Sequence, residues 1–143
     1  MEMVKKILIV VSVIIIIALA SFVFPRLLEQ NSEKKDAIAA DEFLSIYNYL
    51  EDKEFSTAKI EGSTLVLKDK DLNTIAEYDL DRKIKSKLLY IQNRNTNMIF
   101  WMSGFDDLEG IMFLKSGWTD EAWEGLVRIK RIQGNAYKVY TFG

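Results

Sequence analysis

Cysteine and histidine are both absent from this 143-residue sequence. Without cysteine there can be no disulfide, no thiolate nucleophile, no thiolate zinc site and no lipid attached to a cysteine. Without histidine there is no Ser-His-Asp or Cys-His catalysis, no imidazole metal ligand and no ordinary general base near neutral pH. The most familiar catalytic and metal-binding groups are therefore excluded.

Positive charge is not in excess either. The sequence has 19 Lys and Arg residues against 21 Asp and Glu residues, a net charge of −2. A nucleic-acid-binding protein needs concentrated positive charge to displace counterions. We therefore expect no nucleic acid among the partners, and no motif predicts a cofactor.

The sequence has a single proline, Pro25, which follows the one long apolar run, Ile7 to Phe24 (ILIVVSVIIIIALASFVF). This run contains no charged residue, and Ser12 and Ser21 are its only polar side chains. Its 18 residues would span about 27 Å as an α-helix, close to the ~30 Å hydrocarbon core of a bilayer. Residues 1–24 are therefore predicted to be an N-terminal transmembrane anchor or signal segment, with Ile7 to Phe24 in contact with membrane lipid.

The charges that flank the run predict its orientation. Lys5 and Lys6 directly precede it, which favours a cytoplasmic N-terminus and a C-terminal domain outside the cell membrane. The other flank carries Arg26, Lys34 and Lys35, so the count of basic residues alone does not decide the orientation. The expectation is a single-pass signal-anchor with an extracytoplasmic domain.

Cleavage is the alternative to a retained anchor. Ala18-Leu19-Ala20 matches the A-x-A pattern of signal peptides, and a cut after Ala20 would make the protein secreted. Phe22, Val23 and Phe24 continue the apolar run past that site, where a signal peptide usually turns polar. A retained anchor is therefore the favoured interpretation.

Residues 25–35 are predicted to be a juxtamembrane linker and residues 36–143 an extracytoplasmic domain. The linker is rich in neither glycine nor proline, so a helix that runs straight through it is also possible. Apolar spacings of three and four predict a helix over Asp36 to Asp52, capped by Asn31, Ser32 or Asp36. Its apolar stripe, expected to pack on a sheet, comprises Ala39, Ala40, Phe43, Ile46, Tyr47 and Leu50.

Strand patterns fill most of the remaining sequence. TAKIE and TLVLK flank Gly62-Ser63, a two-residue hairpin signal that sets Ile60 opposite Leu65. MIFWM (98–102) and IMFL (111–114) are apolar at every position, which is typical of strands buried on both faces, so we place them in the middle of the sheet. Further strands are predicted over 74–80 and 87–92 and in a final hairpin that sets Arg131 opposite Lys138.

The segments between these strands are predicted to be irregular. Residues 81–86 and 103–110 are predicted as loops, and residues 117–125 as one helical turn capped by Thr119. The total is one helix followed by about seven strands in hairpin order, with no βαβ alternation. This pattern predicts an α+β fold in which one helix packs on an antiparallel meander sheet, with a small closed β-barrel as the alternative.

One motif and one cluster of residues are candidates for chemistry. Asp69 to Asn73 (DKDLN) matches the start of a calcium loop, but Thr74 replaces the required glycine and Leu80 the bidentate glutamate, so we interpret it as a turn and predict no metal site. Acidic residues are concentrated in 106–109 and 120–124, with aromatic residues beside them that would suit a sugar or peptide platform. The candidate binding residues are Phe105, Asp106, Asp107, Glu109, Trp118, Asp120 and Trp123.

Four functions fit these features, and one of them is a subunit of a larger membrane complex, which would need the span itself. The favoured one is a membrane-anchored, non-catalytic binding or interaction module with a protein or envelope component as partner. The second is a secreted binder or inhibitor released by cleavage after Ala20. The third is a hydrolase that uses the carboxylates of Asp106, Asp107, Glu109 or Asp120 as acid and base.

Overall fold

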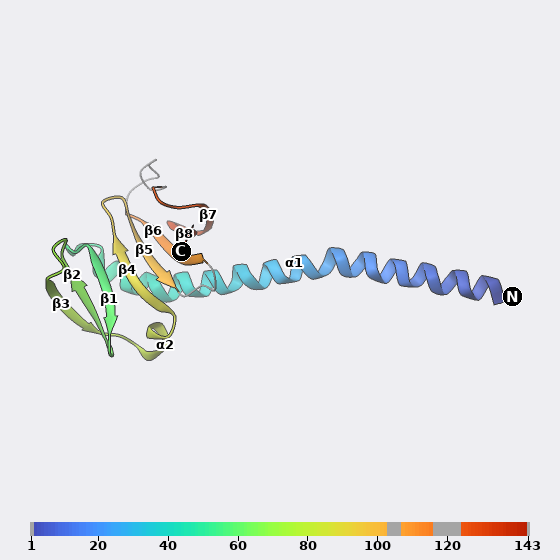
Figure 1. Ribbon diagram of the computed structural model, residues 1–143, viewed down its shortest axis with the longest axis horizontal. Helices are drawn as coiled ribbons and strands as arrows, with labels where there is room; N and C mark the ends of the chain where they lie inside the picture. The colour runs from blue at the N-terminus through green and yellow to red at the C-terminus, as the bar shows by residue number, and fades with distance from the viewer. Residues whose placement is uncertain (1, 103–106, 116–123, 143) are drawn as a thin grey trace. The chain divides into compact units, whose positions relative to one another are not determined.

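The computed structural model describes residues 2–102, 107–115 and 124–142. The chain divides into two compact units, Met1–Lys35 and Asp36–Gly143. One long helix, α1 (Glu2–Leu50), contains all the described residues of the first unit and begins the second. Figure 1 shows this helix and the strands of the second unit.

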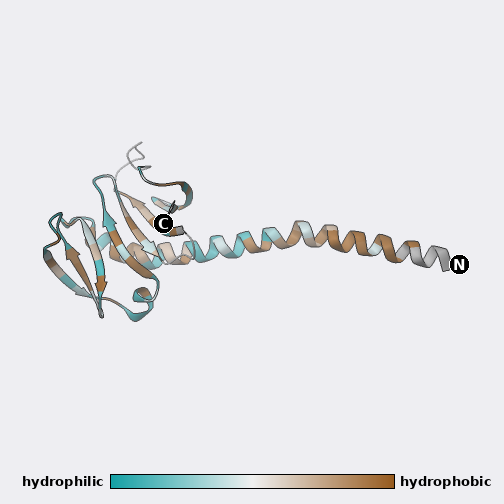
Figure 2. Cartoon of the chain, viewed as in Figure 1, coloured by the Kyte–Doolittle hydropathy of each residue, from teal (hydrophilic) through white to brown (hydrophobic). Residues whose placement is uncertain are grey.

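The described residues of the first unit are all helical, and the apolar side chains described in it are exposed. Phe22 and Phe24, for example, are 71% and 65% exposed. Pro25 lies inside α1, where its missing N–H removes one helical hydrogen bond without ending the helix. Of the two possibilities for residues 25–35, the continuous helix is the one present, so Asn31 and Ser32 are interior residues instead of caps. Figure 2 shows the change along α1 from apolar to polar residues.

The second unit is an antiparallel sheet in the order β3-β2-β1-β4-β5-β6-β8-β7. The predicted α+β fold is therefore confirmed, with eight strands instead of about seven, and the sheet does not close into a barrel. Two neighbours are not consecutive in sequence: β4 pairs with β1, and β8 pairs with β6. The strands are β1 (Thr57–Glu61), β2 (Thr64–Lys68), β3 (Thr74–Asp79), β4 (Leu88–Asn93), β5 (Asn97–Met102), β6 (Asp107–Leu114), β7 (Arg128–Gln133) and β8 (Ala136–Phe142).

The end of α1 covers one face of this sheet. Phe43 stacks on Phe100 of β5 at 5.1 Å between ring centroids, and Tyr47 stacks on Phe113 of β6 at 4.9 Å. Because the helical residues that face the sheet recur at three and four positions, they form one apolar stripe. This confirms the predicted stripe as core, although Ile46 is only partly buried.

A second, smaller core lies on the other face of strands β5, β6 and β8. It contains Ile99, Trp101, Met112, Leu114 and Val139, all buried. Strand β5 is therefore buried at every position, as its lack of alternation predicts. Gly110 of β6 fits here because an added Cβ would stand 2.9 Å from the carbonyl oxygen of Phe100.

Three local predictions are wrong. Residues 81–86 are not a loop throughout, because a four-residue helix α2 (Arg82–Lys85) begins after Asp81, whose carboxylate accepts a hydrogen bond from the backbone N–H of Lys83. Residues 107–110 belong to β6 and not to a connection. In the final hairpin, a register shift between Arg131 and Gln133 sets Lys130, and not Arg131, opposite Lys138. The helical turn predicted over 117–125 lies largely outside the described residues.

Candidate functional site

An open cleft of about 1000 Å³ lies where α1 ends and several connections of the sheet meet. Its lining comes from the α1–β1 connection, strands β2 and β3 with the turn between them, the end of β4 with the β4–β5 turn, and the residue that follows β6. These segments are separated from one another in the sequence. They meet because β4 pairs with β1 and not with β3.

The charged residues that line the cleft come from several connections of the fold. The α1–β1 connection supplies the exposed acidic residues Glu51, Asp52 and Glu54 together with Lys53, and the β2–β3 turn supplies Asp69 and Lys70. The β4–β5 turn and the end of β6 supply Arg94 and Lys115. The lining is therefore net acidic at the α1–β1 connection and basic at Arg94 and Lys115, an arrangement that suits a polar ligand carrying charges of both signs.

Hydrogen bonds hold the basic part in place. The ammonium of Lys115 donates to the backbone oxygen of Arg94 at 2.7 Å, and burial lowers the pKa of Lys115. The Arg94 guanidinium donates to the backbone oxygen of Glu124 at 2.6 Å and to Oε1 of Gln92 at 3.2 Å. The same Gln92 oxygen accepts from the indole N–H of Trp101 at 3.2 Å. The basic groups are thus fixed to the sheet.

Asn93 connects the acidic part of the lining to β4. Its Nδ2 donates to the backbone oxygen of Phe55 at 2.8 Å, and its backbone N–H donates to the oxygen of Ser56 at 2.9 Å. Its Oδ1 is buried and has no hydrogen-bond partner among the described residues. A buried acceptor of this kind is unusual in proteins, because its lost hydration is not replaced.

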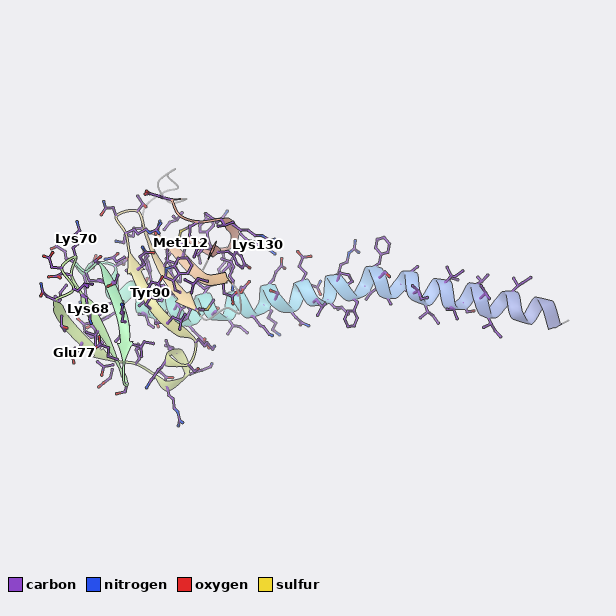
Figure 3. All side chains as sticks on the ribbon, viewed as in Figure 1. Lys68, Lys70, Glu77, Tyr90, Met112 and Lys130 are labelled. Atoms are coloured by element: carbon purple, nitrogen blue, oxygen red, sulfur yellow. The ribbon has the colours of Figure 1, made fainter. Side chains whose placement is uncertain are left out.

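The β2–β3 turn contains the sequence that resembles the start of a calcium loop. One Asp69 oxygen accepts from the backbone N–H groups of Asp71 and Asn73, both at 2.9 Å, and the other accepts from Nδ2 of Asn73 at 3.1 Å. These bonds, led by the Asn73 side chain, lower the pKa of Asp69. Leu72 takes φ +66°, as a tight turn requires. The carboxylate therefore organises the turn, which presents Lys70 at the cleft (Figure 3).

Only two of the residues singled out from the sequence lie in the described part of the chain. Phe105, Asp106, Trp118, Asp120 and Trp123 lie outside the described residues. Asp107 begins β6, and Glu109 lies in the same strand and not in a loop. The cleft that the structure presents was not found from the sequence.

Glu109 takes part in an ion cluster. The ammonium of Lys138 on β8 is 3.0 Å from a carboxylate oxygen of Asp36 on α1 and 3.0 Å from one of Glu109. Burial of Lys138 opposes its charged form, but the hydrogen bonds to these two carboxylates outweigh that cost and raise the pKa of Lys138. The described contacts of Glu109 therefore join β6 to β8 and α1.

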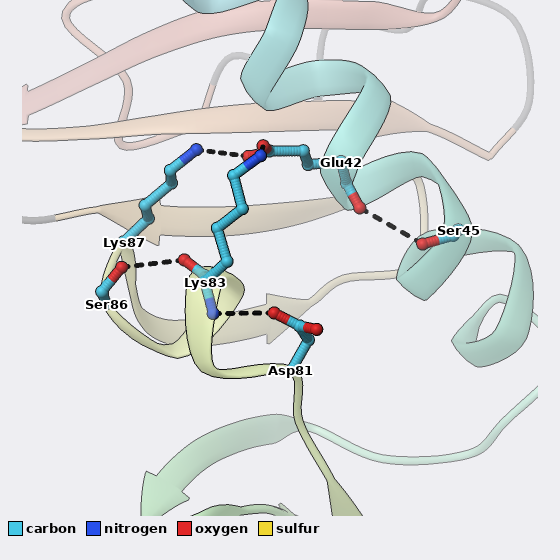
Figure 4. Close-up of polar contacts among 6 residues, drawn as sticks. All are labelled: Glu42, Ser45, Asp81, Lys83, Ser86 and Lys87. Carbon is cyan, nitrogen blue, oxygen red and sulfur yellow. Dashed lines mark hydrogen bonds and ion pairs between the residues drawn. The ribbon is translucent and has the colours of Figure 1, made fainter.

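A second ion cluster joins α1 to α2. One carboxylate oxygen of Glu42 forms an ion pair with Lys83 at 2.7 Å, and the other accepts a hydrogen bond from Lys87 (Figure 4). Hydrogen bonds from Lys83 and then Lys87 lower the pKa of Glu42. In the described ranges 2–102, 107–115 and 124–142, no group of three or more Asp and Glu residues is placed to hold a metal ion.

Comparison of the chain with protein-family models, curated proteins and solved structures finds no match.

Proposed function

We propose that this chain is a single-pass membrane protein whose domain, Asp36–Gly143, lies outside the cell and binds a partner through the cleft without catalysing a reaction. The observation that carries the proposal is the exposure of the apolar helix. One helix near the N-terminus is long and apolar enough to span a membrane, with a mean hydropathy of 2.5 over its most apolar window.

A lipid environment is energetically favourable for this segment. Fifteen large apolar side chains between Ile7 and Leu28 are more than a third exposed. At about 1.5 kcal/mol for each side chain removed from water, the gain on entering lipid is on the order of 20 kcal/mol. A backbone that is hydrogen-bonded within a helix can enter the hydrocarbon region at little cost. Membrane insertion therefore accounts for this segment better than exposure to water does.

Orientation follows from the flanking charge. Lys5 and Lys6 next to the span favour its N-terminal end on the cytoplasmic side, which directs the domain outward. Retention of the span requires that the chain is not cut after Ala20. The intact mass of the membrane-extracted protein tests this, and a mass that begins at Ser21 would favour the secreted alternative.

The proposal of a binding role rests on the cleft. Its volume of about 1000 Å³ is at the upper end of the range for small-molecule sites, and its lining is charged and open, which suits a polar segment of another protein or of an envelope polymer. Catalysis by cysteine or histidine is excluded by composition. Glu42 and Glu109 are each bound to lysine, which favours structural roles for both.

Site-specific photo-cross-linking in intact cells tests the cleft. A photoreactive residue at Asn95, in the lining, is compared with one at Lys59, which is exposed on β1 and outside the cleft. We expect a cross-linked product from position 95 that is absent at position 59. Glu54→Lys should weaken this product several-fold because it reverses a charge of the lining, whereas Lys59→Glu should leave it unchanged. Equal products from both positions would contradict a role for the cleft.

A further inference from the structure

The two edge strands of the sheet carry opposite charge. Strand β3 (TIAEYD) contains two acidic residues and no basic one, whereas strand β7 (RIKRIQ) contains three basic residues and no acidic one. All five of these charged residues are exposed. Figure 3 labels Glu77 and Lys130, one at each end of the sheet.

An edge strand is a ready binding surface because about half of its backbone N–H and C=O groups point away from its only neighbour. In the part of the chain that the structure describes, β3 pairs only with β2, and β7 pairs only with β8. Ile75 of strand β3 is 51% exposed.

We propose that the chain self-associates head to tail, with β7 of one copy adding to β3 of the next. Every pairing in the eight-stranded sheet is antiparallel, so the two edge strands run in opposite directions. A second copy placed beside the first in the same sense therefore continues the antiparallel order. Its helix-covered face then lies on the same side as that of the first copy.

Arg131 of β7 and the acidic residues of β3 lie on the same face in this arrangement, whereas Arg128 and Lys130 of β7 lie on the face toward α1. Glu77 is paired with Val66, which lies between the core residues Leu65 and Leu67, so Glu77 is on the face away from α1. Arg131 is paired with Tyr137, which packs on the second core and is thus on the same face. Directly opposed side chains on one face of an antiparallel pair are close enough for opposite charges to stabilise it.

The same charges disfavour the two symmetric alternatives. Pairing β3 with β3 would bring the acidic residues of two copies together, and pairing β7 with β7 would bring their basic residues together, and like charges directly opposite are destabilising. The mixed pairing is the one in which each edge meets its complement. Such an interface is heterologous, so it grows by repeated addition unless the rotation between copies closes a ring.

Charge reversal on both edges tests this proposal, because the sequence has no cysteine and one label can be added cleanly. Full-length chain kept in detergent carries a donor or an acceptor dye on Ser63→Cys, in the exposed β1–β2 turn. The reporter is energy transfer between copies over a dilution series. Variant A carries Glu77→Lys and Asp79→Lys, which make both edges basic, and variant B carries Arg128→Glu and Arg131→Glu, which make both edges acidic.

Each variant alone should associate at least about tenfold more weakly than the wild type, because like charges now face each other. An equimolar mixture of A and B should recover energy transfer to near the wild-type level, since the acidic edges of B match the basic edges of A. This recovery also shows that both variants are folded. Association unchanged in A and B, absent in the wild type, or not restored in the mixture would overturn the proposal. None of these outcomes depends on whether the chain spans a membrane.

Discussion

Replacement of Lys138 by methionine should destabilise the domain strongly, because it leaves two carboxylates without their shared cation. The Lys138 side chain is 5% exposed, and its partners Asp36 and Glu109 are 17% and 36% exposed. Removing one member of a buried ion pair typically costs 3–5 kcal/mol. Glu109 can turn to solvent, so we discount its share and expect a loss of about 2–3 kcal/mol.

A triple variant separates lost packing from unpaired charge. Adding Asp36→Asn and Glu109→Gln to Lys138→Met removes the unpaired carboxylates, and it should recover about 1 kcal/mol or more of the loss. Urea unfolding of the full-length chain in mild detergent measures this, with the fluorescence of buried Trp101 as the reporter. A midpoint unchanged by Lys138→Met, or a triple variant no more stable than the single one, would refute the reasoning.

The pH dependence of this cluster has a definite sign. The pKa of Lys138 is raised above its ordinary value of 10.5 in the folded protein. The stabilisation that comes with this shift is therefore fully present below about pH 10.5 and is lost as the pH rises through the folded pKa. The difference in stability between wild type and Lys138→Met should stay constant between about pH 7 and 9 and then shrink above about pH 10.5.

Three further substitutions have predictable effects. Glu42→Gln should lower the free energy of unfolding in urea by up to about 1 kcal/mol at neutral pH. Because the pKa of Glu42 is lowered from 4.5 in the folded protein, its contribution to stability is present above about pH 4.5. This contribution should vanish as the pH falls through the folded pKa. Gly110→Ala should lower the free energy of unfolding by about 1–3 kcal/mol in the same assay, because the new Cβ would meet the carbonyl oxygen of Phe100. An unchanged urea midpoint would show that β5 and β6 separate easily. Asn93→Ala should cost about 1–2 kcal/mol and weaken cross-linking from the cleft, because the oxygen of Phe55 loses its donor; stability and cross-linking equal to wild type would contradict this role.

The secondary structure was predictable where one physical signal dominated. The Gly62-Ser63 turn fixed the register of the first hairpin, and Ile60 indeed pairs with Leu65. The continuous apolar pattern of 98–102 and 111–114 identified the interior strands β5 and β6. These patterns are local, and each one is set by burial of the strand that carries it.

The final hairpin and the cleft could not be predicted in the same way. A bulge shifts β7 by one residue, and nothing in RIKRIQ marks its position. The pairing of β1 with β4 brings the α1–β1 connection to the β4–β5 turn, and this pairing is not between consecutive strands. The cleft therefore depends on sheet order, which hairpin signals alone do not determine. Most of the residues chosen as candidates from composition lie outside the described part of the chain.

Labelling single cysteines in intact cells tests the proposed membrane topology most directly, because the sequence contains no other cysteine. Ser63→Cys places a thiol in the exposed β1–β2 turn, and Glu2→Cys places one on the N-terminal side of the apolar helix. With a membrane-impermeant maleimide, we predict that position 63 is labelled in intact cells and position 2 only after permeabilisation. Labelling of position 2 but not position 63 in intact cells, or recovery of the full-length chain in the soluble fraction without detergent, would contradict an anchored domain outside the cell.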